Sequence, residues 1–73
     1  MAHPRISLDP AVMGGKACIV GTRITVEAVL DHLASGETVE ELLAGYPPLT
    51  AADVRAAMAY AAEHLRTDGF VAV

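Results

Sequence analysis

Apolar side chains recur at helical spacing in three separate stretches of the chain. In each stretch they follow one another at intervals of three and four positions, which aligns them along one face of an α-helix. The stripes are Val26, Val29, Leu30 and Leu33; Val39, Leu42, Leu43 and Tyr46; and Val54, Ala57, Met58, Ala61 and Leu65. The pattern predicts three helices that pack around a common core.

Residues that commonly begin and end helices flank these stripes. Thr25 is the predicted N-cap of the first helix, and Gly36 is its predicted stop. The second and third helices each begin with a threonine that an acid follows three positions later, as in a capping box. These pairs are Thr38 with Glu41 and Thr50 with Asp53. Gly45 and Pro47-Pro48 separate the two helices, so residues 38–61 have the outline of a helix-turn-helix.

Two short stretches near the N-terminus have the character of β-strands. Residues 5–8 alternate polar and apolar side chains, residues 16–20 form a second candidate strand, and Gly14-Gly15 marks a turn between them. A hairpin of two such strands is marginally stable alone, so it needs a third strand, a helix face or a second copy. No third stretch has a comparable strand signal, which favours strand pairing across a homodimer.

The predicted fold is therefore mainly α: a three-helix helix-turn-helix domain, homeodomain-like or winged-helix-like, with a short N-terminal β-hairpin. The domain covers residues 1–66, and residues 67–73 form an apolar C-terminal tail. Gly69 ends the helical pattern, and Phe70, Val71 and Val73 follow it. A tail of this kind folds back on its own domain, stays unordered or binds a partner.

Size and charge restrict the function classes. The chain has 73 residues, of which 53% are apolar and many are alanine. A chain of this length hides about 60% of its unfolded surface, so the core is thin and an oligomer or a complex is favoured. Residues 1–26 contain three cations and one acid, whereas residues 27–73 contain two cations and eight acids. This separation predicts two different surfaces, and the pI of about 5.1 argues against strong non-specific binding of nucleic acid by the monomer.

Reactive and metal-binding side chains are scattered along the sequence. His3, His32 and His64 lack the spacing of metal ligands. Cys18, the single cysteine, is expected to be a small buried side chain, with a Cys18–His dyad as the remaining enzymatic alternative. We therefore expect no enzyme, metal, cofactor or small-molecule substrate. No apolar run approaches the ~20 residues of a membrane span and no signal peptide is evident, so a cytoplasmic protein is expected.

An ordered series of short motifs extends over residues 5–65. It comprises Ile6, Asp9-Pro10, Gly14-Gly15-Lys16, Ile19, Gly21-Thr22-Arg23-Ile24, Val26, Gly36, Tyr46-Pro47, Leu49 and the stretch 53–62. In these motifs the chain resembles the DUF433 family. The resemblance implies a small prokaryotic helix-turn-helix-like domain that serves as the antitoxin of a VapBC-like pair. It further implies a PIN-like (DUF5615-type) ribonuclease toxin as the partner, dimerisation, and binding to the protein's own operator DNA.

Basic side chains supply the candidates for operator binding. Phosphate contacts are expected from Arg5, Lys16 and Arg23, with backbone donors at the helix start at Thr50. Arg55 is the candidate base reader on the third helix. Alanines stand where a recognition helix usually carries its other long polar side chains, so the third helix is a poor reading surface.

Two alternatives stand beside these assignments. Arg23 has a structural alternative, in which it pairs with Glu40 or Glu41 and holds the hairpin on the helices. The whole protein has functional alternatives: a DNA-binding transcriptional regulator without a toxin partner, or a dimeric structural or interaction module.

The end of the third helix and the tail supply the candidates for toxin binding. Leu65, Phe70, Val71 and Val73 are expected to fill an apolar groove on the toxin, anchored by the aromatic ring. Arg66 lies beside them and is expected to enter the acidic site of a metal-dependent ribonuclease. Its charge would compete there with Mg²⁺ for the carboxylates.

Overall fold

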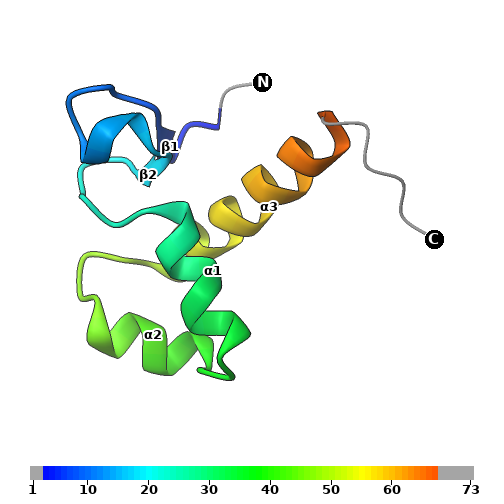
Figure 1. Cartoon of the computed structure of the whole chain (residues 1–73). Helices are drawn as coiled ribbons and strands as arrows, with labels where there is room; N and C mark the ends of the chain where they lie inside the picture. Colours follow the sequence, from blue (N-terminus) through cyan, green and yellow to red (C-terminus); the bar gives the residue numbers. More distant parts are fainter. Residues whose placement is uncertain (1–2, 68–73) are drawn as a thin grey trace.

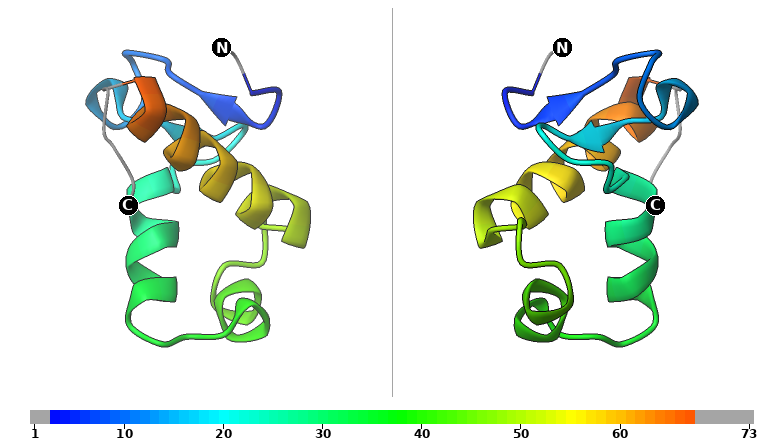
Figure 2. Two further views of the ribbon diagram at one scale, coloured as in Figure 1. Left: turned by 90° about the vertical axis from the view of Figure 1, so that its right-hand side faces the viewer. Right: turned by 90° about the vertical axis from the view of Figure 1, so that its left-hand side faces the viewer.

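Residues 3–67 are described by the computed structural model, and they form three α-helices and a two-stranded hairpin (Figure 1). In chain order the elements are β1 (Ile6–Ser7), the short 3-10 helix η1 (Met13–Gly15), β2 (Cys18–Ile19), α1 (Val26–Ala34), α2 (Val39–Gly45) and α3 (Ala51–Thr67). The hairpin and α2 lie at opposite ends, and α1 and α3 cross between them (Figure 1 and Figure 2). The mainly helical fold with an N-terminal hairpin is confirmed. Within residues 3–67, no helix is long and apolar enough to cross a membrane.

The three predicted helix starts are present. At each, the N-cap threonine hydroxyl accepts a hydrogen bond from the backbone N–H three residues later, which satisfies one of the free donors of the first turn. In α2 and α3 the acid also accepts from the backbone N–H of its threonine, so both form reciprocal capping boxes. The hydroxyl acceptors and their donors are Thr25 with Ala28 (2.9 Å), Thr38 with Glu41 (3.1 Å) and Thr50 with Asp53 (3.2 Å).

A left-handed glycine ends α1. Gly36 has a φ of +99° and donates to the Leu33 carbonyl, while the Glu37 N–H donates to the His32 carbonyl. This pair of bonds defines a Schellman motif. The side chains of the same two residues, His32 and Glu37, are also in contact, with Nδ1 of His32 2.7 Å from Oε1 of Glu37. His32 also shares a hydrogen bond of 3.1 Å with the Tyr46 hydroxyl, which joins the end of α1 to the end of α2.

A tight turn connects α2 to α3. The Leu49 N–H donates to the Tyr46 carbonyl over 2.9 Å and closes the turn that contains Pro47 and Pro48. Neither proline can donate a backbone hydrogen bond, so the helix cannot continue through them. Leu49 itself is buried, and it fixes the turn against the core.

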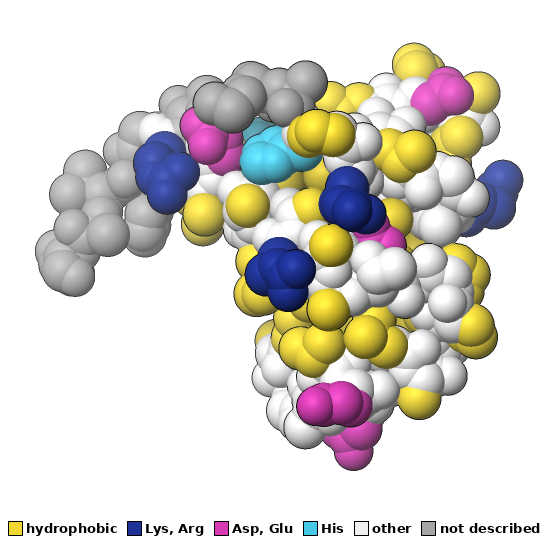
Figure 3. Space-filling model, turned by 180° about the vertical axis from the view of Figure 1, so that it is seen from behind, with side chains coloured by type: hydrophobic (Ala, Val, Ile, Leu, Met, Phe, Trp, Pro, Cys, Tyr) yellow, Lys and Arg dark blue, Asp and Glu magenta, His cyan; other side chains and the backbone are white. Residues whose placement is uncertain are grey.

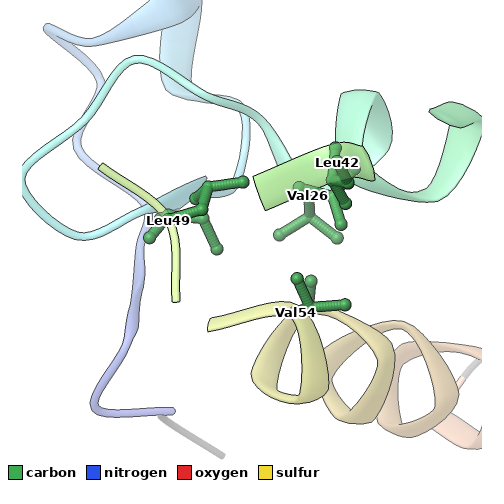
Figure 4. Close-up of a cluster of buried hydrophobic side chains, with 7 residues drawn as sticks. Val26, Leu42, Leu49 and Val54 are labelled. Atoms are coloured by element: carbon green, nitrogen blue, oxygen red, sulfur yellow. The ribbon is translucent and has the colours of Figure 1, made fainter. Parts of the chain in front are cut away.

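Seven buried apolar side chains among residues 3–67 form the core: Ile19, Val26, Val29, Leu42, Leu49, Val54 and Ala57. Figure 4 shows Val26, Leu42 and Val54 directed toward a common interior, with Leu49 beside them. All three helices and the hairpin contribute, as the apolar stripes predict. The core is small, since large side chains such as Leu30 and Leu33 are only partly buried at its edge.

The predicted stripe of α3 is wrong at Met58 and Leu65. Met58 and Leu65 are 43% and 52% exposed, whereas Tyr60 packs against the core. The buried face of α3 is shifted from the predicted stripe toward the flank that carries Asp53 and Tyr60. Asp53 is buried at the first turn, and Tyr60 offers a large apolar ring on the same flank. The spacing of apolar residues alone does not decide which of two adjacent faces of this alanine-rich helix is buried.

The strands are shorter than predicted, and β2 has a neighbour on each side. Ile6 pairs with Ile19 and Ser7 with Cys18 in antiparallel register. On its other side, β2 bonds to the extended segment before α1: the Ile19 N–H donates to the Ile24 carbonyl, and the Val26 N–H donates to the Ala17 carbonyl. The sheet nevertheless has two strands within residues 3–67, because the contact between Cys18 and Thr25 is an isolated bridge. An extended N-cap residue, Thr25, makes this pairing possible without a strand-like sequence.

Candidate functional site

A groove of about 630 Å³ runs between α1 and the C-terminal half of α3. Its lining comes from three parts of the chain: residues 16–17, the first turns of α1 and the later turns of α3. The lining residues are Lys16, Ala17, Thr25, Val26, Glu27, Leu30, Asp31, Tyr60, Ala61, His64 and Leu65. The surface inside the groove is mainly apolar, while charged side chains stand at its edges.

Small side chains contribute to the lining of the groove. Ala17 and Ala61 contribute only methyl groups, so the walls there stand back from each other. The length of α3 also contributes, because its last turns extend beyond the core-forming residues (Figure 1). Leu65 lies on these last turns, and half of its surface remains open to solvent.

An aromatic cluster forms one side of the groove. The Tyr60 ring packs edge-on against His3, with ring centroids 5.7 Å apart, and it stacks with His64 at 6.1 Å. These contacts fix the orientation of Tyr60 at the groove wall. Such edge-to-face and stacked pairs add about 0.5–1.5 kcal/mol beyond area burial.

Ion pairs at the groove edge are exposed and weak. Nζ of Lys16 lies 3.2 Å from Oε1 of Glu27, and Nη1 of Arg66 lies 3.5 Å from Oε1 of Glu63. Exposed pairs of this kind contribute about 0–1 kcal/mol. Lys16, predicted to contact phosphate, therefore lies beside an acid. Arg66, predicted to contact a toxin, stands on the last turns of α3 next to the groove.

Two of the predicted toxin-binding residues lie within the described part of the chain. Leu65 and Arg66 are neighbours on α3, where Leu65 lines the groove and Arg66 is largely exposed. Phe70, Val71 and Val73 lie outside the described residues.

Arg5 and Asp53 meet at the start of α3. Nη1 of Arg5 donates to Oδ1 of Asp53 over 3.1 Å, and the Thr50 N–H donates to Oδ2 over 3.0 Å. Burial raises the pKa of the Asp53 carboxyl, but the hydrogen bonds from Thr50 and the charge of Arg5 prevail and lower it below the usual value of 3.8. An ionised acid thus stands where backbone donors were expected to bind phosphate.

Arg23 lies at the hairpin end of the molecule. It is exposed beside a polar hollow of about 500 Å³ that Asp9 and Thr22 also line. The alternative pairing with Glu40 or Glu41 does not form within residues 3–67, because α2 is at the opposite end (Figure 1). Glu41 instead caps its own helix.

The basic side chains do not form one continuous patch on the face shown in Figure 3. The dark blue side chains there are separated by apolar and neutral surface, and an acidic patch covers the lower end, where α2 lies. Arg55 is exposed on α3. Of the five predicted DNA-binding residues, Arg5 and Thr50 meet at Asp53 near the start of α3, which also carries Arg55. Lys16 pairs with Glu27, and Arg23 lies at the hairpin end.

The single cysteine is a buried core neighbour. Cys18 is 1% exposed and sits in β2, so the prediction of a small buried side chain is confirmed. Among residues 3–67, no three His, Cys, Asp or Glu side chains are placed to hold a metal ion.

Sequence reasoning missed the α1–α3 groove. The signal that could have revealed it is the alanine-rich stretch of α3, which we interpreted as missing base readers. Small residues on a helix also leave space beside its neighbour, and Ala61 lines this groove together with Leu30.

Comparisons with known proteins place the chain in a family. Residues 6–61 match the family model described as a protein of unknown function, DUF433. An uncharacterized protein of Sinorhizobium fredii, y4eO, is 36% identical over 60 residues, which cover 82% of this chain and 27% of that protein. This chain thus spans about a quarter of that relative's length.

A solved structure has the same fold. The crystal structure of a DUF433 member from Anabaena variabilis is 40% identical, with a TM-score of 0.80 over 86% of this chain and 62% of that chain. Family match, sequence identity and fold agree, and the chain belongs to the DUF433 family.

Proposed function

We propose that this protein is the antitoxin of a type II pair, which binds and inhibits a PIN-like (DUF5615-type) ribonuclease. The observation that carries the proposal is the apolar groove that Leu65 lines, with the exposed Arg66 next to it in α3. An exposed leucine beside a long cation suits a partner with an apolar surface next to an acidic catalytic site. The resemblance of the motifs to antitoxins of the family supplies the identity of that partner.

Arg66 is suited to act as the inhibitory group. Its bond to Glu63 is long and exposed, so exchange for a partner carboxylate would sacrifice little stability. A guanidinium placed among the carboxylates of a ribonuclease would compete with Mg²⁺ and hold the catalytic metal out. In this proposal the antitoxin has no catalytic role of its own and acts by occupying the catalytic site of the ribonuclease.

Binding to the product of the adjacent gene tests the proposal. Replacing Leu65→Ala should weaken the complex about 30-fold, which corresponds to a hot-spot loss of ~2 kcal/mol, in calorimetric titration. Arg66→Ala should reduce inhibition of Mg²⁺-dependent RNA cleavage more than it reduces affinity. Leu8→Ala and Arg23→Ala are the matched controls, since both residues are exposed at the hairpin end. Unchanged affinity of the Leu65 variant, or no complex at all, would contradict the proposal.

Operator binding is the second candidate function. Arg23 and Arg55 favour it, since both are exposed and neither forms an ion pair with another residue in the range 3–67. The acid at the start of α3 opposes it. Gel-shift titration against the upstream DNA at low salt, with and without the partner, should show a shift. The double variant Arg23→Ala with Arg55→Ala should bind this DNA more weakly and with a smaller salt dependence. No shift under either condition would exclude this function.

The proposed antitoxin is a homodimer that pairs through its hairpin. β2 has neighbours on both sides, so the outer edge of β1 is the free one within the described chain. Val20, whose N–H donates to the Arg5 carbonyl, is an exposed apolar side chain of the hairpin. Light scattering after gel filtration should give twice the chain mass, and Val20→Glu should give the monomer mass.

A further inference from the structure

The polar hollow at the hairpin end brings together two loops that are separated in the sequence. One wall is the loop that follows β1, and the other is the turn that follows β2. The hollow has a volume of about 500 Å³, and the proposed inhibition of a ribonuclease makes no use of it. Its lining residues are Ser7, Asp9, Val12, Gly21, Thr22 and Arg23.

Hydrogen bonds fix both walls of the hollow. In the first loop, the Ala11 N–H donates to Oδ1 of Asp9 over 2.9 Å and orients the carboxylate. In the second, the Thr22 hydroxyl donates to the Ile19 carbonyl over 2.8 Å and accepts from the Ile24 N–H over 3.0 Å. The hollow is therefore formed before any ligand arrives, as most small-molecule sites are.

Two opposite charges line the hollow without neutralising each other. Asp9 and Arg23 are both exposed, and within residues 3–67 neither forms an ion pair. The Ser7 hydroxyl lines the same hollow and forms no hydrogen bond in this part of the chain. One wall thus offers a carboxylate as acceptor, and the other offers the planar set of N–H donors of a guanidinium.

Ligands with a single charge match this lining poorly. A phosphate would bind Arg23 but would be repelled by Asp9, and a metal ion would find one carboxylate beside a guanidinium. A nucleobase would find no aromatic side chain for stacking among the described lining residues. A small molecule that carries both a carboxylate and an ammonium group matches both charges.

We propose that the hairpin hollow binds a free α-amino acid. The Arg23 guanidinium holds the α-carboxylate through parallel N–H donors, and the Asp9 carboxylate accepts from the α-ammonium group. Val12 is the aliphatic side chain of the lining, which favours a ligand with a small aliphatic side chain. Binding at this hollow is independent of the proposed ribonuclease partner.

Amide chemical shifts of the ¹⁵N-labelled full chain measure the binding of L-alanine at constant ionic strength. The signals of Ser7, Thr22 and Arg23 should move and saturate as L-alanine is added. N-acetyl-L-alanine lacks the ammonium group and L-alaninamide lacks the carboxylate, so each should bind about 10-fold more weakly or worse. Equal binding of either analogue would overturn the proposal, because the hollow would then recognise one charge only. Absence of saturable shifts with L-alanine would overturn it as well.

Two variants assign the two charges to their residues. Arg23→Ala and Asp9→Asn should each weaken the binding of L-alanine about 10-fold or more. Asparagine preserves the loop, because its side-chain oxygen also accepts from the Ala11 N–H. Arg55→Ala and Asp31→Asn are the matched controls, since both residues are exposed outside the hollow, and they should leave binding unchanged.

Variants and analogues together form a cycle that tests the pairing of groups. In Arg23→Ala, L-alanine should lose its advantage over L-alaninamide, because the partner of the carboxylate is gone. In Asp9→Asn, L-alanine should lose its advantage over N-acetyl-L-alanine, because the partner of the ammonium group is gone. Advantages that persist in these variants, with their amide spectra still those of the folded chain, would contradict the proposal.

Discussion

At the scale of single residues, Asp53 has two roles. Its carboxylate caps the start of α3 and also holds Arg5, which lies 48 positions earlier in the chain. The residue is 6% exposed, so its charge depends on these partners. The capping role follows from the spacing of Thr50 and Asp53. The pairing with Arg5 does not, since nothing in the local sequence connects the two residues.

Replacing Asp53→Asn should destabilise the protein by about 1–3 kcal/mol at pH 7, because hydrogen bonds to a charged group are lost. The pKa of Asp53 is lowered on folding, so its stabilising effect is present above the usual value of 3.8 and is lost as the pH falls through the folded value. Urea unfolding of both proteins between pH 7 and pH 2 should therefore show a difference that narrows below about pH 4.

Asp31→Asn is the control for this measurement. Asp31 is exposed on α1 and forms no ion pair with any residue in the range 3–67. The substitution should change stability by less than about 0.5 kcal/mol at any pH in the series. A difference between wild type and Asp53→Asn that stays constant with pH would show that the ionised carboxylate does not stabilise the fold.

At the scale of elements, glycines with different backbone conformations separate turn geometry from helix propensity. Gly36 is left-handed, with a φ of +99°, whereas Gly45 has helical geometry at the end of α2. A β-carbon at either position would meet open space, because no heavy atom lies within 4 Å. Any effect of alanine therefore comes from the backbone and not from a clash.

Gly36→Ala should destabilise the protein by about 1–2 kcal/mol, because a non-glycine residue resists the left-handed conformation. Gly45→Ala should instead be neutral or stabilising by up to about 1 kcal/mol, because alanine loses less conformational entropy in a helix. Chemical denaturation of the two variants side by side gives both values. Equal stability of the two variants would mean that the Schellman motif does not hold the end of α1.

At the scale of the whole molecule, the fold depends on a core of few side chains. Leu42, in α2, is the largest fully buried one and belongs to the core cluster that α1 and α3 also line. A domain of this length has a free energy of unfolding of roughly 4–11 kcal/mol at ~0.05–0.15 kcal/mol per residue. One buried leucine therefore represents a large part of the total.

Leu42→Ala should lower the free energy of unfolding by about 2–5 kcal/mol, through lost burial and the cavity left behind. Leu8→Ala, at a position 59% exposed, should lower it by less than about 0.5 kcal/mol. Thermal unfolding followed by circular dichroism measures both. A loss below about 1 kcal/mol for Leu42→Ala would mean that the three helices do not share one core.

The sequence by itself determined the local structure of this protein. Threonine caps, the glycine after α1 and the spacing of apolar residues act over three to five positions, so the three helices begin, and α1 and α2 end, where the pattern predicts. The burial of Cys18 also follows from the short apolar stretch around it. Membership of the family follows from an ordered series of short motifs.

Only the tertiary structure decided how these elements face one another. It selected the side of α3 that carries Tyr60, gave β2 a second neighbour, paired Arg5 with Asp53 and opened the groove between α1 and α3. Each of these depends on contacts between residues far apart in sequence. An alanine-rich helix offers several nearly equivalent faces, and the choice among them is made by the shapes of the elements it meets.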